Sequence, residues 1–200
     1  MGIKLEYGKG QTPLDENEFG GLKIKTITTV GELNEHEQNN IEEAVQWALN
    51  RKIPTDTLLT KEWIFNLHYR MYNKVWEWAG QQQRTTNKNI GVDKKSIIIA
   101  LYNLLDTTKY WITNKTYDPI EIAIRFKHEL VSIHCFPNGN GRHARLCADI
   151  LIYQLTGQEG FSWGSHNNLY QESEIRSEYI TALKLADTGD YRKLIEFANS

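Results

Sequence analysis

The segment that decides the fold reads HCFPNGNGRHAR and runs from His134 to Arg145. Apolar side chains recur at helical spacing over residues 122–133 before it and over residues 144–155 after it. Within the segment, a proline and two glycines interrupt this pattern, as such residues do in loops. The spacing therefore predicts two helices joined by a short loop, with the second helix beginning near Gly141.

The loop carries residue types that suit an anion. Gly139 and Gly141 allow tight turning and close backbone approach to a ligand, and a helix N-terminus presents unpaired N–H groups with partial positive charge. Arg142 and Arg145, at i and i+3, share one face of the first turns. Cations disfavour a helix N-terminus unless an anion offsets them, so the arrangement indicates a phosphate-bearing ligand.

His134 lies across the same loop, at the end of the preceding helix. An ordinary imidazole pKa near 6.5 suits proton removal from a hydroxyl at neutral pH. Taken singly, each feature has a plainer interpretation: an inter-helix turn, a helix-capping histidine, or a solvated arginine pair. Their combination within twelve residues favours transfer chemistry on a phosphate-bearing ligand.

The rest of the chain indicates an all-α domain with one short β-flap. Asp118, Pro119 and Glu121 mark the start of the helix that ends at residue 133. Asn34 and Glu37 are a candidate capping pair. Other helices are predicted over residues 32–50, 61–72, 96–111 and 175–186, a hairpin or loop over 76–91, and an extended arm over 1–30.

Composition excludes several classes of protein. The 200 residues hold 23 Lys plus Arg against 25 Asp plus Glu, a balance that argues against a nucleic-acid binder. Apolar residues at 40% and aromatic residues at 11% exclude a disordered chain. No window of 18 apolar residues indicates a membrane span. Cys135 and Cys147 are too few for a disulfide scaffold, so we expect reduced thiols and a cytoplasmic protein.

The segment resembles the signature of the Fic family, His-x-Phe-x-(Asp or Glu)-Gly-Asn-Gly-Arg-x-x-Arg. It matches at His134, Phe136, Gly139, Asn140, Gly141, Arg142 and Arg145. The resemblance extends backwards through Trp78-Ala79-Gly80, Arg84 and Asn89-Ile90-Gly91, and forwards through Arg176, Tyr179 and Ala182-Leu183. Within the family, the chain is most similar to the group labelled mobile mystery protein B. The resemblance implies an all-α Fic-type helical bundle over residues 31–200, with a β-hairpin flap over the active-site loop.

The resemblance also implies an enzyme that moves AMP from ATP to a Tyr, Thr or Ser hydroxyl of a target protein or of itself. His134 would be the general base, and Phe136 would anchor the loop. Backbone N–H groups of residues 139–141 would bind phosphate, Asn140 would steady this anion hole, and Arg142 and Arg145 would hold the β- and γ-phosphates. Gly141 stands where the phosphoryl-transferring Doc branch has Lys, which favours nucleotidyl transfer. The target-docking flap would use Arg84, Thr85, Asn89, Ile90 and Gly91.

One position departs from the signature. The acidic residue that would hold Mg²⁺ is replaced by Asn138, whose neutral amide oxygen is a weaker ligand for a hard cation. Two alternatives therefore stand beside adenylyl transfer. One is a catalytically weak nucleotide-binding or toxin–antitoxin interaction protein, and the other is transfer of a different group, UMP or phosphocholine. Nothing in the residues indicates an oligomeric state.

Many Fic proteins are restrained by a (Ser or Thr)-x-x-x-Glu-(Gly or Asn) motif whose Glu pairs with the second signature arginine. Residues 12–17 fit this pattern and offer Glu16. Residues 28–33 offer Glu32, with Leu33 at the last position. The hypothesis is that Glu32 or Glu16 meets Arg145; the plainer interpretation of either is a cap or an exposed side chain.

Overall fold

The computed structural model describes residues 20–81, 91–164 and 174–200. The described part is helical, which confirms the all-α fold class. Its helices are α2 (Val30–Leu49), α3 (Thr55–Leu58), α4 (Lys61–Tyr72), α5 (Ile97–Asn114), α6 (Pro119–Ile133), α7 (Asn140–Thr156), α8 (Glu174–Ala186) and α9 (Arg192–Ala198).

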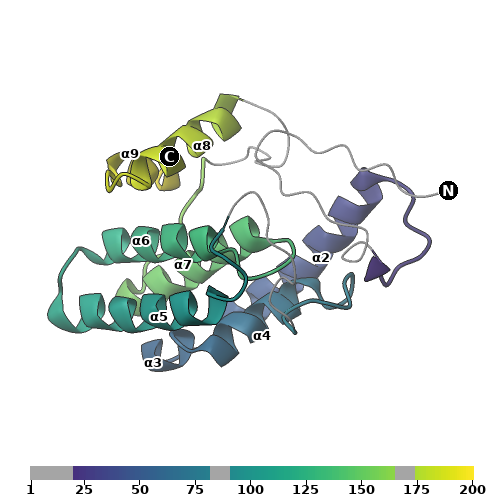
Figure 1. Ribbon diagram of the computed structural model, residues 1–200, viewed down its shortest axis with the longest axis horizontal. Helices are drawn as coiled ribbons and strands as arrows, with labels where there is room; N and C mark the ends of the chain where they lie inside the picture. The colour runs from purple at the N-terminus through teal and green to yellow at the C-terminus, as the bar shows by residue number, and fades with distance from the viewer. Residues whose placement is uncertain (1–19, 82–90, 165–173) are drawn as a thin grey trace.

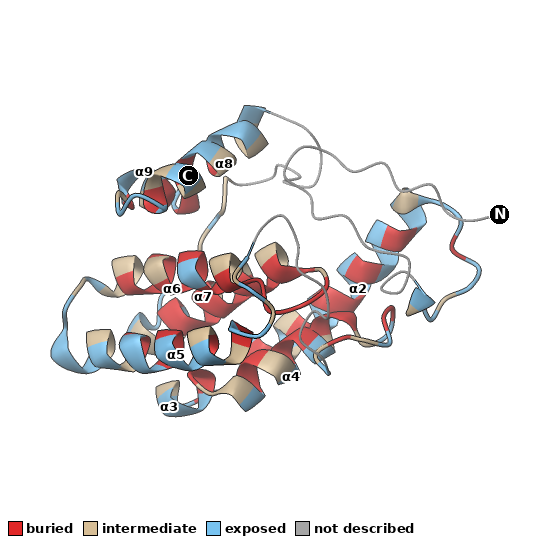
Figure 2. Ribbon diagram, viewed as in Figure 1, coloured by how far each residue is buried: buried red, intermediate tan, exposed pale blue. Residues whose placement is uncertain are grey.

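The helices form a bundle around the α6–α7 pair (Figure 1). α5 packs on α6, α2 packs along α4, and both α2 and α4 contact α7. Figure 2 shows the buried faces of α4, α5, α6 and α7 turned toward one another. Because α6 and α7 lie in the middle of this core, the loop between them is held on both sides.

The helix that leads to the loop begins as predicted. Asp118 is the N-cap of α6 and its side chain accepts a hydrogen bond from the backbone N–H of Ile120, while Pro119 occupies the first turn. Its buried residues include Ile122, Phe126 and Leu130, which are four residues apart and lie on the face predicted from that spacing. The sequence pattern therefore predicts correctly where α6 begins and which of its faces is buried.

The predicted capping pair at Asn34 and Glu37 was wrong. α2 begins at Val30, and Thr29 is its N-cap in a capping box with Glu32. Asn34 is consequently an exposed residue inside the helix, whereas Glu37 is buried. The short helices α3 and α9 were not predicted, since four and seven residues are too few to show a clear period.

The arm and the flap are described only in part. Residues 21–29 precede α2 and pack on the fold, where Leu22 forms an antiparallel bridge with Trp76. Residues 1–19, and with them Glu16, lie outside the described residues. So do Arg84, Thr85, Asn89 and Ile90, and the β-hairpin over them stays a prediction.

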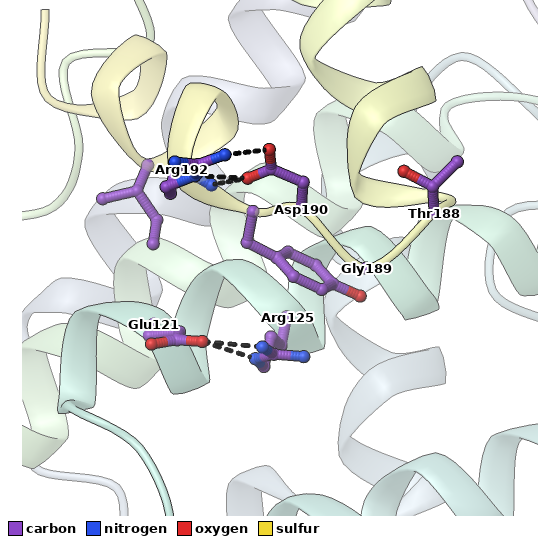
Figure 3. Close-up of a pocket in the computed structure, with 8 residues that line it drawn as sticks. Glu121, Arg125, Thr188, Gly189, Asp190 and Arg192 are labelled. Carbon is purple, nitrogen blue, oxygen red and sulfur yellow. Dashed lines mark hydrogen bonds and ion pairs between the residues drawn. The ribbon is translucent and has the colours of Figure 1, made fainter.

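The C-terminal pair α8–α9 packs on α6 through a second apolar cluster that includes Ile124, Tyr179 and Leu194. A surface pocket of about 440 Å³ lies where this pair meets α6. Figure 3 shows its two arginines already paired, Arg125 with Glu121 and Arg192 with Asp190. No residue of the 134–145 segment lines this pocket.

Among the described residues, no helix is both long enough and apolar enough to cross a membrane.

Candidate active site

His134 ends α6 in an unusual backbone conformation. It is the C-cap residue with φ 58° and ψ 60°, the left-handed region that few residues other than glycine adopt. The side chain is 4% exposed. This turn stops the helix and directs the next two residues, Cys135 and Phe136, into the core. His134 thereby stands at the boundary between a packed helix and the loop.

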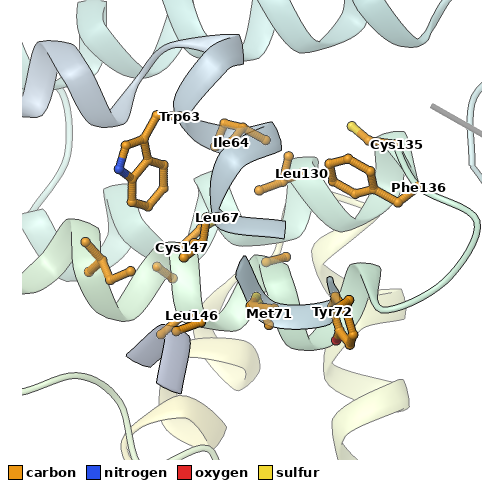
Figure 4. Packing of buried hydrophobic residues seen from close by; sticks show 14 of the residues in the cluster. Trp63, Ile64, Leu67, Met71, Tyr72, Leu130, Cys135, Phe136, Leu146 and Cys147 are labelled. Atoms are coloured by element: carbon orange, nitrogen blue, oxygen red, sulfur yellow. The ribbon is translucent and has the colours of Figure 1, made fainter. Parts of the chain in front are cut away.

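Phe136 anchors the loop, as expected. Its ring is fully buried and stacks on the His68 ring of α4, with centroids 3.7 Å apart and planes 15° from parallel. Figure 4 shows Phe136 and Cys135 close to Leu130 of α6 and near side chains of α4. The first half of the loop is thus part of the hydrophobic core.

Asn140 fixes the second half of the loop to the first. Its Oδ1 accepts from the backbone N–H of Phe136 at 2.9 Å, and its Nδ2 donates to the Phe136 carbonyl at 2.8 Å. The side chain is 5% exposed. Asn140 was predicted to steady an anion hole, and these two hydrogen bonds give it a means to do so, because they hold the loop backbone in one conformation.

The two glycines of the loop are constrained differently. Gly139 has φ +77°, and a Cβ there would lie 2.6 Å from ring atoms of Tyr72. Gly141 lies in the first turn of α7, and a Cβ there would meet nothing within 4 Å. Gly139 is therefore required by the protein itself, whereas the protein leaves open space beside Gly141.

His68 of α4 is linked to the loop, although no motif in the sequence marks it as a site residue. Its Nδ1 accepts from the backbone N–H of Gly80 at 3.0 Å, and its Nε2 lies 3.0 Å from the carbonyl oxygen of Asn138. Burial lowers the pKa of His68 well below its ordinary value, so the ring is neutral with its proton on Nε2. His68 thus ties the loop to Gly80, two residues before the undescribed segment 82–90.

The two signature arginines both project from the first turns of α7, as predicted. Arg142 pairs with Glu37 of α2, its Nη1 lying 2.6 Å from Oε2, and its guanidinium lies 5.0 Å from the Tyr72 ring centroid. Arg145 lies over the Tyr179 ring of α8 at 5.8 Å. Each arginine therefore has a partner from a different helix.

Asn138 offers a metal ion an amide oxygen but no carboxylate. Its Oδ1 accepts a hydrogen bond from the backbone N–H of Gly139, and its carbonyl faces His68. Within residues 20–81, 91–164 and 174–200, His, Cys, Asp and Glu side chains form no group of three that could hold a metal. The described residues thus do not build the carboxylate ligand that the family signature carries for Mg²⁺.

The predicted inhibitory contact is not made by Glu32. Its Oε2 accepts from the backbone N–H groups of Thr28 and Thr29, and these hydrogen bonds lower the pKa of Glu32. Among the residues that the structure describes, the carboxylate that pairs with a signature arginine is that of Glu37. A signal for it existed in the sequence, because Glu37 interrupts an apolar stripe between Leu33 and Ile41. Glu16 stays a prediction.

Comparison with known proteins agrees with this geometry. The model of the Fic/DOC family matches residues 58–152, which span α4 to most of α7 and contain the loop. The chain carries a Fic/DOC domain. It is 28% identical over 141 residues to protein adenylyltransferase fic-1 of Caenorhabditis elegans, covering 67% of this chain and 25% of that protein. It is 26% identical over 152 residues to protein adenylyltransferase Fic of Drosophila grimshawi, covering 74% and 30%. The chain thus spans about a quarter to a third of these curated relatives.

Solved Fic structures share the fold. A Fic-1 fragment from C. elegans superposes with a TM-score of 0.63 at 24% identity, covering 89% of this chain and 50% of that chain. The BepC effector of Bartonella tribocorum, solved with bound AMPPNP, superposes with a TM-score of 0.64 at 18% identity, covering 96% and 93%. These likenesses extend the Fic fold beyond the matched residues 58–152 of this chain.

Proposed function

We propose that this Fic domain is a protein adenylyltransferase that moves AMP from ATP to a Tyr, Thr or Ser hydroxyl of a target protein. The observation that carries the proposal is the loop itself. A buried histidine at the end of one helix and two arginines at the start of the next flank a loop whose backbone is held by Asn140. The names of the relatives and the AMPPNP bound by BepC support a nucleotide substrate.

In the proposed reaction, the hydroxyl oxygen of the target attacks the α-phosphorus of ATP. His134 takes the hydroxyl proton, the bond between the α-phosphorus and the bridging oxygen breaks, and pyrophosphate leaves. Backbone N–H groups at the N-terminus of α7 and the guanidinium groups of Arg142 and Arg145 stabilise the charge on the phosphates. The rigid loop lowers the cost of reorganising these donors during the reaction.

Magnesium is proposed to arrive with the nucleotide. Mg²⁺ is commonly held by one or two carboxylates together with phosphate oxygens and water, and here Asn138 is the one signature residue that could add a protein oxygen. Bound in this way, the ion would neutralise phosphate charge. The residues of this chain keep their roles without it: His134 as base, and the α7 N-terminus with the arginines as anion site.

Two parallel incubations test the reaction class. The chain is mixed with candidate target proteins, or kept alone for self-modification, with either α-labelled or γ-labelled ATP and with Mg²⁺. Adenylyl transfer predicts protein-bound label from the α position only. Label from the γ position only would indicate phosphoryl transfer, and the absence of label despite measurable ATP binding would indicate a nucleotide-binding protein without transfer activity.

A further inference from the structure

Glu37 is a buried acidic residue in the middle of α2, with both carboxylate oxygens engaged. Oε2 lies 2.6 Å from Nη1 of Arg142, and Oε1 accepts from the indole Nε1–H of Trp76 at 2.6 Å. The residue is only 4% exposed. A buried carboxylate costs free energy unless it is paired and hydrogen-bonded, and Glu37 meets both conditions.

Buried contacts hold both Trp76, one partner of Glu37, and the helix α2 that carries Glu37. Trp76 is 1% exposed and stacks on Trp78, with ring centroids 4.9 Å apart. One turn further along α2, Asn40 donates to the carbonyl of Arg70 at 2.8 Å and accepts from the backbone N–H of Lys74 at 2.9 Å. α2 is therefore fastened by two buried polar side chains on one face. Glu37 is therefore held in place by a core tryptophan as well as by Arg142.

The Glu37–Arg142 pair also offsets an unfavourable charge at the N-terminus of α7. Arg142 stands in the first turn of that helix, where a cation is unfavourable next to the positive end of the helix dipole. Glu37 supplies an anion there before any nucleotide binds. A guanidinium has five N–H donors in a fixed planar fork, so the contact with Glu37 and the position over the Tyr72 ring together restrict the orientation of the whole group.

We infer that Glu37 is a positioning residue that, held by Trp76, fixes the guanidinium of Arg142 for binding to the nucleotide's β- and γ-phosphates. The inference rests on the proposed function, since it assumes that Arg142 meets those phosphates. An arginine side chain that is already ordered loses less conformational entropy on binding. Removing the Glu37 carboxylate therefore weakens the binding of ATP and leaves the binding of AMP, which lacks those phosphates, nearly unchanged.

The test measures the affinities of AMP and ATP by calorimetry for the whole chain and for Glu37→Gln. We expect about a tenfold loss of ATP affinity in the variant, with AMP affinity changed by less than about twofold. The AMP titration of the same sample reports the folded fraction, so misfolding is not mistaken for the effect. Glu35→Gln is the matched control, because Glu35 is an exposed residue of the same helix and should change neither affinity.

Two more variants make the test specific. In an Arg142→Ala background, Glu37→Gln should cause no further loss of ATP affinity, because its effect passes through Arg142. Trp76→Phe removes the indole donor together with part of a buried ring, and it leaves the Glu37–Arg142 ion pair in place, so it should cause a smaller loss in the same direction.

An unchanged or increased ATP affinity in Glu37→Gln overturns the inference. An increase would mean that Glu37 holds Arg142 away from the phosphates. If the unsubstituted chain does not bind ATP, the proposed function and the inference both fail; if it binds ATP but transfers no label, only the proposed function fails.

Discussion

At the scale of single residues, Gly139 and Gly141 separate what the fold needs from what a ligand would need. Gly139→Ala would force a side chain into a left-handed position and against the Tyr72 ring. We expect this change to lower the free energy of unfolding by at least about 1–2 kcal/mol, the cost of a left-handed residue before any clash is added. Urea unfolding followed by circular dichroism measures it.

Gly141→Ala is the matched control for that substitution. Its Cβ meets no protein atom and it replaces a glycine inside a helix. Stability should therefore stay the same or rise by up to about 1 kcal/mol. Equal losses of stability in the two variants would contradict the structural distinction between the two glycines.

Asn138 is the residue at which the metal requirement can be tested. Asn138→Asp places a carboxylate where the family signature has one, and carboxylates bind Mg²⁺ more strongly than amides do. We expect the Mg²⁺ concentration for half-maximal transfer of label to fall several-fold. Asn138→Ala serves as the comparison and should raise that concentration or leave it unchanged. A lower Mg²⁺ requirement in Asn138→Ala would contradict a role of this side chain in holding the ion.

The residues of the loop could be predicted from the sequence, but their partners could not. Arg142 was expected to face phosphate, and its pairing with Glu37 joins residues 105 positions apart in the chain. His68 lies 70 positions from Asn138. Such pairings depend on how α2 and α4 pack on α7, and helical periodicity within one segment contains no information about that packing.

At the scale of elements, the start of α2 is a direct test of the corrected helix boundary. Thr29 accepts from the backbone N–H of Glu32, so Thr29→Ala removes the cap. We expect a loss of about 1 kcal/mol in the free energy of unfolding. Asn34→Ala alters an exposed position inside the helix and should change stability by less than about 0.5 kcal/mol. Chemical denaturation of both variants decides between them, and a larger loss for Asn34→Ala would restore the boundary expected from the sequence.

Asp149 of α7 connects that helix to the segment before α8, accepting from the backbone N–H of Phe161 and from Trp163 Nε1, each at 2.9 Å. Burial raises its pKa from 3.8 to about 6, against the opposing effect of these hydrogen bonds and of Arg145. The folded protein therefore favours the protonated acid. The stability that this gives is fully present below pH 3.8 and is lost as the pH rises through about 6.

Asp149→Asn removes this titration while keeping Oδ1 as an acceptor. The stability of the unsubstituted chain relative to the variant should therefore decrease between pH 4 and pH 7, by up to about 3 kcal/mol. His143, whose pKa burial lowers to about 4, titrates in both proteins and cancels in the difference. Parallel stability curves over this pH range would show that folding does not raise the pKa of Asp149, and would contradict this prediction.

The longer helices could be predicted because their apolar faces repeat over several turns, as in α6 and α7. α3 and α9 could not, since they hold four and seven residues. The true cap of α2 was missed because several polar residues precede its apolar stripe, and Thr29 and Asn34 both suit a cap chemically. Only the packing of Leu33 and Glu37 on the core selects the earlier start.

At the scale of the whole molecule, the balanced charge hides one concentrated feature. The N-terminus of α7, Arg142 and Arg145 gather positive potential at a single loop. Side chains of α2, α4 and α8, together with Asn140 of α7 itself, hold this loop and its arginines in place. The fold could be predicted from one twelve-residue segment because that segment matches a family signature. The internal supports of the site could be seen only in three dimensions.

The central claim is that the loop transfers adenylate with His134 as the base. The most direct measurement is the transfer of label from α-labelled ATP to protein by the unsubstituted chain and by His134→Ala, with ATP affinity measured for both. We predict that the substitution lowers transfer by at least about a hundredfold, the lower range for general base catalysis, while ATP affinity changes little. Equal transfer by the two proteins would contradict the claim, as would the absence of transfer from the unsubstituted chain with every target protein tried and with itself.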